Sequence, residues 1–328
     1  MLLVDKWIEC YYGQSGTGKS ESIAAVIRRI YKETGKKFRI LVGDGSAATY
    51  AALVGAGIAS IVDYTTRDWP LSTLSQLCEG YWPENPDDPK SKMLPMTPAI
   101  FATLGGYAIE GLSVGANYIM GDRKGGFAAR AALGEKIAGD SPVQLIDLER
   151  DAAGNVRPGT GPGLAFGGVT LGGYGHAQRR MLGFIEKSKG LPGWVIWTAH
   201  ERSSEDKVSN QKLIGPEVAG GALTASLSRL FNNTLHFATA EKTVKAKDEH
   251  TEKLVDVIDS EYRIYTRDHF RPEGNTFVKY KAVCRTPDPK SMPLYLESED
   301  PGASIIEFYE KIKQAREKQI ADLKGSAA

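Results

Sequence analysis

A short glycine-rich stretch near the start of the chain carries residue types that bind phosphate. Residues 13–20 read GQSGTGKS and fit the pattern GxxxxGK[ST] at every fixed position. Glycines let the backbone wrap an anion without a Cβ in the way, so that successive N–H groups point inward. The lysine then reaches the β- and γ-phosphates, and the serine hydroxyl is a ligand for Mg²⁺. The residues expected to bind a nucleotide are Gly13, Gln14, Ser15, Gly16, Thr17, Gly18, Lys19, Ser20 and Glu21.

The segments on either side of this stretch match what a phosphate-binding loop requires. Residues 7–12 are rich in aromatic and β-branched types, which predicts a strand. Residues 23–31 place apolar side chains on one helical face, and Gly35 stands where a helix C-cap is expected. Strand, glycine loop and helix together predict binding of a nucleoside triphosphate with Mg²⁺. The pattern does not separate an ATPase from a GTPase or a kinase.

The composition excludes several other classes. The chain has 328 residues, 41% hydrophobic and 25% charged, with a net charge of +1, so contact with nucleic acid must be local. Cys10, Cys78 and Cys284 are widely spaced and form no CxxC, which favours a reducing cytoplasm over a zinc site or disulfides. Cys10 is expected to be a core thiol. No apolar run reaches membrane-spanning length, so we expect no membrane partner and no targeting segment.

The order of predicted elements favours an α/β fold with a mostly parallel sheet flanked by helices. The first strand and helix are followed by a strand at 38–43, a small-residue helix at 47–54 and a strand at 58–64. This β-α-β-α-β order is typical of a parallel sheet with helices on both faces. Further strands are expected at 107–109, 194–199 and 235–239, and further helices near 70–78 and 174–189.

Two stretches interrupt a core that we expect to span residues 1–240. Residues 81–98 are rich in proline, aspartate and lysine, and residues 114–170 are rich in glycine. Both compositions predict loop-rich insertions, with one helix near 126–137. Residues 201–215 also read as a polar, lysine-bearing loop.

The C-terminal part adds two features to this core. Residues 241–300 are expected to extend the same domain through an antiparallel edge hairpin, whose strands at 262–266 and 277–283 flank a turn at 272–275. Residues 301–328 are expected to form an amphipathic helix. The simplest interpretation of this helix is packing on the domain, and the alternative is contact with a partner.

Hydrolysis needs more than a phosphate loop. One carboxylate helps to hold Mg²⁺ through water, another orients the attacking water, and both usually follow strands beside the first one. Asp44, Glu110 and His200 each follow a predicted strand. Glu110 is expected to support the metal with Ser20, and Asp44 to orient the water. His200 is expected to sense the γ-phosphate. The alternative for Glu110 is an ordinary exposed acid, for Asp44 a turn-forming aspartate, and for His200 a structural histidine.

The order of these features resembles the RecA-like ATPases. The phosphate loop comes first, followed by a strand that ends near Asp44 and a strand that ends in the sequence IEGLS (109–113). A strand that ends in TAHE (198–201) and the tripeptide GPE (215–217) come next, and the resemblance covers residues 5–240. The resemblance is closest to short phage-encoded members, the phage nucleotide-binding ATPases and the single-strand-annealing-associated RecA paralogues of the Sak group. It implies ATP and Mg²⁺ as ligands, and hydrolysis coupled to single-stranded DNA in phage recombination or replication. The family usually has aspartate where this chain has Glu110, and glutamate near Asp44.

The same resemblance implies that the loops after Glu110 and His200 face single-stranded DNA. Lysine and arginine in these loops would contact phosphates, although for each residue taken singly we favour the alternative that it is solubilising surface charge. A homo-oligomer, as a ring or short assembly in the host cytoplasm, is also implied. The candidate DNA-binding residues are Arg123, Lys124, Arg202, Lys207 and Lys212.

Three other functions remain open at this point. A DNA-packaging or helicase-type motor would hydrolyse ATP on a similar fold but would carry a nuclease or helicase-loading domain. A small-molecule or nucleoside kinase would need an acceptor pocket and commonly an arginine-rich lid, and arginines are sparse in 114–170. A nucleotide-gated scaffold would act by recruiting a partner through the C-terminal helix or the 81–98 insertion.

Overall fold

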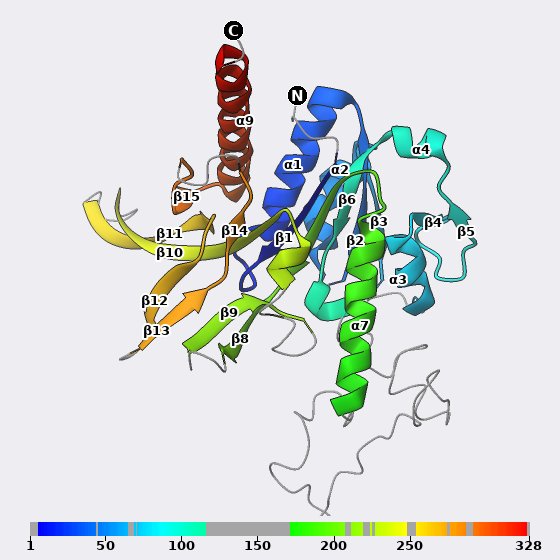
Figure 1. Cartoon of the computed structure of the whole chain (residues 1–328), viewed down its shortest axis with the longest axis horizontal. Helices are drawn as coiled ribbons and strands as arrows, with labels where there is room; N and C mark the ends of the chain where they lie inside the picture. Colours follow the sequence, from blue (N-terminus) through cyan, green and yellow to red (C-terminus); the bar gives the residue numbers. More distant parts are fainter. Residues whose placement is uncertain are drawn as a thin grey trace, which may run out of the picture.

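A nine-stranded, mostly parallel sheet forms the centre of the molecule in a computed structural model (Figure 1). Six adjacent strands run parallel in the order β10-β1-β7-β6-β2-β3, and β14, β11 and β15 are antiparallel to their neighbours on the β10 side. This arrangement confirms the predicted α/β class. The structure describes residues 6–43, 45–64, 69, 71–115, 171–206, 211–218, 224, 227–247, 254–273, 276–286 and 291–326.

Most strands belong to the main sheet, and the others form two small sheets. The main-sheet strands are β1 (Lys6–Tyr12), β2 (Lys37–Val42), β3 (Ala59–Asp63), β6 (Leu104–Ile109), β7 (Gly193–Ala199), β10 (Asn233–Lys247), β11 (Leu254–Tyr265), β14 (Val283–Cys284) and β15 (Tyr295–Ser298). A second sheet has the order β12-β13-β9-β8. Its strands are β8 (Glu201–Asp206), β9 (Gln211–Pro216), β12 (His269–Glu273) and β13 (Thr276–Tyr280). β4 (Tyr81–Pro83) pairs with β5 (Met93–Pro95).

Helices cover both faces of the main sheet and bury two separate hydrophobic clusters. One cluster lies under α1 and α9, and the other lies under α3 and α7. Trp7 and Tyr11 of β1 point into the first cluster, whereas Cys10 and Tyr12 point into the second, as the two-residue period of a strand requires. The helices are α1 (Lys19–Thr34), η1 (Ser46–Tyr50), α2 (Ala51–Gly55), α3 (Leu71–Cys78), α4 (Pro98–Ala102), α7 (Leu171–Ser188), η3 (Leu227–Leu230) and α9 (Pro301–Ser326).

The structure corrects three details of the sequence interpretation. The predicted hairpin partner at 262–266 lies instead within β11, which pairs with β10 and β15, and β13 pairs with β12. Residues 201–206 and 211–216, expected in a loop, form the antiparallel strands β8 and β9. The predicted boundary at residue 240 falls inside β10, which continues to Lys247. The expected helix at 126–137 lies outside the described residues.

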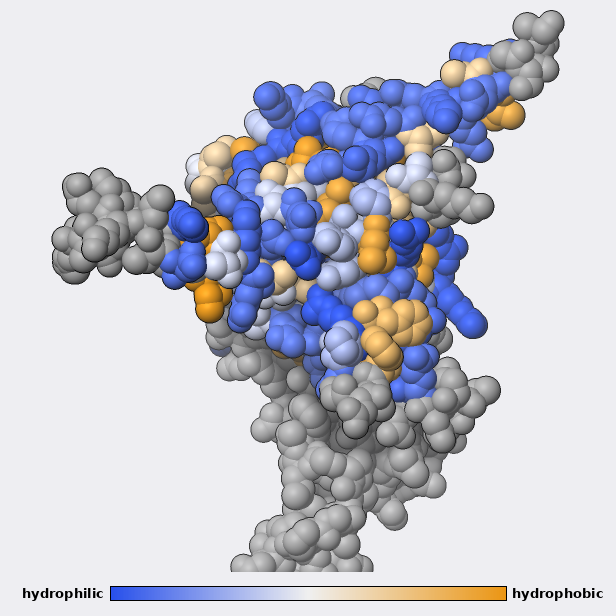
Figure 2. Space-filling view, turned by 90° about the vertical axis from the view of Figure 1, so that its left-hand side faces the viewer, coloured by the Kyte–Doolittle hydropathy of each residue, from blue (hydrophilic) through white to orange (hydrophobic). Residues whose placement is uncertain are grey.

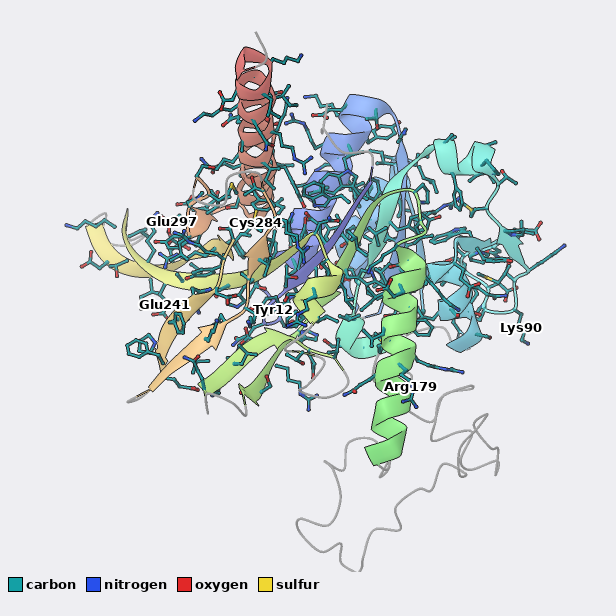
Figure 3. All side chains as sticks on the ribbon, viewed as in Figure 1. Tyr12, Lys90, Arg179, Glu241, Cys284 and Glu297 are labelled. Carbon is teal, nitrogen blue, oxygen red and sulfur yellow. The ribbon has the colours of Figure 1, made fainter. Side chains whose placement is uncertain are left out.

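The insertion at 81–98 is more ordered than a loop. It contains the β4–β5 ladder, and the Arg39 guanidinium lies 4.6 Å from the centre of the buried Trp82 ring. Lys90 lies at its exposed outer end (Figure 3).

The C-terminal helix packs on the domain, as the simpler of the two sequence interpretations predicts. α9 runs beside α1, and Ile305, Phe308 and Ile312 are buried in the cluster that these helices share (Figure 1). The Ser22 hydroxyl on α1 donates to the Pro301 carbonyl at 3.0 Å. The first turn of α9 therefore lies against the beginning of α1.

A buried carboxyl group joins α9 to the strand that leads into the phosphate loop. Glu9 on β1 accepts hydrogen bonds from the Trp7 indole, from the Asn233 amide at 2.6 Å and from the Tyr309 hydroxyl. Tyr309, on α9, also contacts the Tyr11 hydroxyl. Burial raises the pKa of Glu9 from 4.5 to about 7, although the bonds from Tyr309 and Asn233 oppose that rise.

We expect a Glu9→Gln variant to lose one component of the pH dependence of stability. The native chain keeps the Glu9 proton up to about pH 7, whereas the unfolded chain releases it near pH 4.5. The contribution of protonated Glu9 to the free energy of unfolding therefore falls as pH rises from about 4.5 to about 7. The side-chain amide of a glutamine at this position can accept hydrogen bonds from Trp7 and Asn233 and donate one to the Tyr309 hydroxyl, and it does not titrate at these pH values. In urea unfolding, the variant should gain about 2–3 kcal/mol relative to wild type between pH 5 and pH 8.

The control for this prediction is Glu307→Gln, which alters a half-exposed acid on α9. It should keep the wild-type dependence on pH. If the free energy of unfolding of Glu9→Gln depended on pH as that of wild type does, the raised pKa of Glu9 would be contradicted.

Candidate functional site

The phosphate loop, residues 13–20, lies at the carboxyl end of β1 between β7 and β10. The Gly13 N–H donates to the Ala199 carbonyl at 3.3 Å, and a Cβ on Gly13 would lie 2.1 Å from the Phe237 carbonyl oxygen. Only glycine fits so close to a neighbouring backbone. Gly16 and Gly18 have φ values of 77° and 80°, in the left-handed region that favours glycine. The glycines therefore stand where the loop geometry needs them.

Lys19 lies back across the loop and holds it together. Its Nζ atom donates to the Gly13 carbonyl at 3.0 Å and to the Gln14 carbonyl at 2.6 Å, and it lies 3.4 Å from Thr17 Oγ1. Thr17 Oγ1 in turn donates to the Gln14 carbonyl at 2.9 Å. The ammonium group is thus buried beside the loop backbone, where a bound anion would be within reach of both. Ser20 follows on the first turn of α1, next to the exposed Glu21.

Glu110 directly follows β6, at the same sheet edge as the phosphate loop. β7 separates β6 from β1, and the three strands are parallel. The Glu110 carboxylate is fully buried and accepts hydrogen bonds from the Ser46 and Tyr50 hydroxyls. Its carbonyl accepts from the Tyr64 hydroxyl at 3.0 Å. These contacts fix a carboxylate near the ends of β2, β3 and β6, away from bulk water.

His200 directly follows β7, and its backbone is held on both sides. The His200 N–H donates to Ser113 Oγ at 2.9 Å, and the His200 carbonyl accepts from the Glu217 N–H at 2.6 Å. Ser113 Oγ donates to the Glu217 carbonyl at 3.2 Å. The segments after β6, β7 and β9 thus meet at His200, whose side chain is partly exposed.

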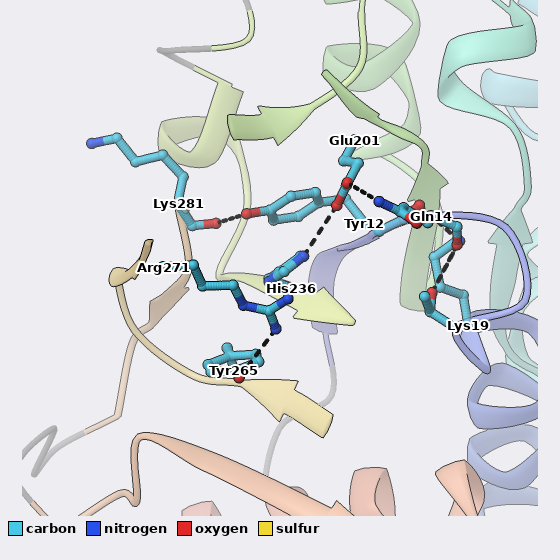
Figure 4. A network of polar contacts seen from close by, with 10 residues as sticks. Tyr12, Gln14, Lys19, Glu201, His236, Tyr265, Arg271 and Lys281 are labelled. Carbon is cyan, nitrogen blue, oxygen red and sulfur yellow. Dashed lines mark hydrogen bonds and ion pairs between the residues drawn. The ribbon is translucent and has the colours of Figure 1, made fainter. Parts of the chain in front are cut away.

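Glu201, to which sequence analysis assigned no role, bonds directly to a side chain of the phosphate loop (Figure 4). Its Oε1 accepts from Gln14 Nε2 at 2.7 Å, and its Oε2 lies 3.3 Å from His236 Nε2. Burial raises the pKa of Glu201, but the hydrogen bonds from His236 and Gln14 outweigh it and leave the pKa below 4.5. Glu201 is therefore ionised at neutral pH and holds the loop to the start of β8.

His236 is a neutral imidazole between several charges. Burial lowers its pKa below 6.5, and the charges of Arg271 and Lys19 add to this effect, although Glu201 opposes it. With Glu201 ionised, the Nε2 atom of His236 carries the proton and donates. Burial, with the neighbouring His236 and Arg271, also lowers the pKa of His269 to about 3.

A stack of aromatic rings extends from His236 toward the second sheet. The His236 ring lies 4.9 Å from Tyr12, the last residue of β1, and 4.8 Å from Tyr280 on β13. The His269 ring on β12 stacks on Tyr265 at 3.6 Å. The Tyr12 hydroxyl donates to the Lys281 carbonyl at 2.5 Å. The phosphate loop and the β12–β13 hairpin are therefore joined by buried rings.

The expected site residues divide into three groups. The structure brings the phosphate loop, Glu110 and His200 to one edge of the sheet, as strand order predicts. Arg202 is exposed and lies 4.0 Å from Glu217, and Lys212 forms an ion pair of 2.5 Å with Glu273. The remaining candidates lie outside the described residues: Asp44, Arg123, Lys124 and Lys207.

Oxygen donors are available for a magnesium ion. The Ser20 hydroxyl and the Glu110 carboxylate are hard ligands of the kind that Mg²⁺ prefers, and Mg²⁺ typically takes only one or two protein ligands beside phosphates and water. Among the described residues, no group of three or more His, Cys, Asp and Glu side chains forms a metal site. The donor set therefore fits an ion held jointly with a nucleotide.

No protein-family model matches this chain, and a search of curated proteins finds no match. Within the described part of the chain, no helix is both long enough and apolar enough to cross a membrane.

We expect Glu201→Ala to loosen the phosphate loop. The change removes the acceptor that Gln14 and His236 share, and it leaves a buried imidazole N–H without this partner. The free energy of unfolding should fall by about 1–3 kcal/mol, and amide hydrogen exchange at residues 14–16 should accelerate. Glu217→Ala is the matched control, because the Glu217 carboxylate lies 4.0 Å from the Arg202 guanidinium, which is a weak contact. Equal amide hydrogen exchange at residues 14–16 in both variants would contradict the role of Glu201 in holding the phosphate loop.

Proposed function

We propose that this chain is a Mg²⁺-dependent, RecA-like ATPase whose hydrolysis is coupled to single-stranded DNA. The observation that carries the proposal is the phosphate loop itself, with its left-handed glycines and buried Lys19. A loop of this shape at the start of a helix binds phosphate through its N–H groups and the helix dipole. A parallel sheet that brings this loop, Glu110 and His200 to one edge is compatible with a RecA-like core.

Lys19 has the central role in binding the triphosphate. Its ammonium group is held by carbonyls of the loop, which it would exchange for the β- and γ-phosphate oxygens. The loop N–H groups then stabilise the charge that builds on the phosphates as the bond to the γ-phosphorus breaks. Gln14 is held by Glu201, so the tip of the loop is positioned before the nucleotide arrives.

Ser20 and Glu110 would hold Mg²⁺, which supplies positive charge to the phosphates. Ser20 would bind it directly, and Glu110 would do so through a water molecule. The Ser46 and Tyr50 hydroxyls keep the Glu110 carboxylate in one orientation for this role. Asp44 would orient the attacking water, and His200 would sense the γ-phosphate.

The segment that follows His200 connects the nucleotide to the DNA in this proposal. Glu201 is the first residue of β8, and Arg202 and Lys212 lie on β8 and β9. Arg202 is exposed, so its guanidinium is available to a DNA phosphate. Arg123, Lys124 and Lys207 would add contacts. A homo-oligomer in the cytoplasm of a phage-infected host, acting in recombination or replication, is the corresponding context.

We expect phosphate release from ATP to require Lys19 and to rise with single-stranded DNA. Lys19→Ala removes the charge that stabilises the transferred phosphate, and it should lower kcat by at least about 100-fold. The measurement is phosphate release with Mg²⁺, with and without a single-stranded oligonucleotide. Lys36→Ala, an exposed lysine just after α1, is the control and should match wild type. Turnover indifferent to DNA would refute the coupling, and transfer to an acceptor other than water would indicate a kinase.

A further inference from the structure

The outer face of the β12–β13 hairpin exposes two aromatic rings. Phe270 and Phe277 are 54% and 64% exposed, values unusual for phenylalanine. Phe270 pairs across the ladder with Lys279, and Phe277 pairs with Pro272, so all four side chains share one face. Figure 2 shows this side of the molecule, where hydrophobic residues lie among hydrophilic ones. We call Phe270, Phe277 and Lys279 the hairpin platform.

The segment around the platform concentrates positive charge. Residues 267–286 contain five lysines and arginines and two acids, a net charge of +3, while the whole chain carries +1. The other residues therefore sum to −2. Arg267 and Arg285 are exposed, and the Lys279 ammonium lies 5.8 Å from the centre of the Phe270 ring. This local charge favours an anionic partner that also has flat apolar groups.

We propose that the hairpin platform binds single-stranded nucleic acid by stacking bases on Phe270 and Phe277, with phosphates near Lys279 and Arg267. Exposed aromatic side chains beside cations are the general means by which proteins bind single strands, because every base has a face that stacks. Bases in a duplex are already stacked on one another, so a duplex does not offer these faces. Asp268 forms an ion pair of 2.9 Å with Lys279 and lies 3.7 Å from Lys281, so this one carboxylate faces two ammonium groups and the segment keeps its net positive charge. A purely apolar partner would not complement that charge.

The inner face of the same hairpin contacts His236, which is linked to the phosphate loop through Glu201. His269, Arg271 and Tyr280 alternate with the platform residues and point toward His236, which Glu201 joins to Gln14 of the phosphate loop. Arg271 lies 5.1 Å and 5.2 Å from the centres of the Tyr265 and Tyr280 rings. A nucleotide that moves Gln14 would shift this stack and the platform behind it. This coupling rests on the proposed function, whereas binding by the platform does not.

The experiment measures binding of labelled oligo-dT, oligo-rU and a duplex to the full-length chain by fluorescence anisotropy. Phe270→Ala and Phe277→Ala should each weaken single-strand binding about 10-fold or more. Phe270→Leu tests stacking, because leucine keeps the apolar character without the ring. Ile258→Ala, at a 74% exposed apolar residue on β11, is the matched control and should bind as wild type does. Circular dichroism establishes that each variant is folded.

Preferential loss of oligo-dT or of oligo-rU binding supports the platform and identifies DNA or RNA as its ligand. Unchanged binding by both alanine variants overturns the inference, and it leaves the proposed function intact if DNA still stimulates phosphate release. Failure of wild type to bind either strand also overturns it, whether or not ATP is hydrolysed. Loss of self-association in the variants, with unchanged oligonucleotide binding, would assign the face to a second copy of the chain and reject nucleic acid.

Discussion

The close approach of the phosphate loop to the strands on either side of β1 is the constraint on which the site depends. Gly13 is hydrogen-bonded to the end of β7 and lies so near the Phe237 carbonyl that no side chain fits there. The loop is thereby fixed by backbone contacts to its two neighbours. The Lys19 ammonium group then stabilises the loop by donating hydrogen bonds to the Gly13 and Gln14 carbonyls. Such a preorganised set of N–H groups and one ammonium costs little reorganisation when an anion binds.

Charged side chains extend this constraint to the second sheet. Glu201 bonds both Gln14 and His236, and His236 lies in a stack of rings that reaches the β12–β13 hairpin. The inner part of this network is buried, so loss of the Glu201 acceptor would leave the His236 N–H without that partner, whereas the bond between Gln14 and Glu201 lies at the surface. The hairpin is thus mechanically connected to the loop. On the opposite face, Glu9 and Tyr309 connect β1 to α9.

The sequence predicted the features that depend on local pattern. Strand, loop and helix around Lys19, and the positions of Glu110 and His200 after strands, follow from residue order and periodicity. The Glu201 contact could not be predicted in this way, because Gln14 is 187 residues distant in the chain. The available signal was a charged residue two positions after the end of the buried strand β7, which lies beside the strand that leads into the phosphate loop. The 262–266 segment was misassigned because its alternation suits an edge strand, whereas β11 is enclosed by β10 and β15.

The central claim is that the phosphate loop binds a nucleoside triphosphate, and equilibrium binding tests it most directly. Calorimetric titration with Mg²⁺–ATP should show saturable binding to wild type. Lys19→Met, which keeps an unbranched side chain but removes the charge, should bind at least about 10-fold more weakly. Its melting temperature without ligand reports whether the variant is folded. Absence of binding to wild type by ATP and by every other nucleoside triphosphate would contradict the account, as would equal affinity of a folded Lys19→Met variant.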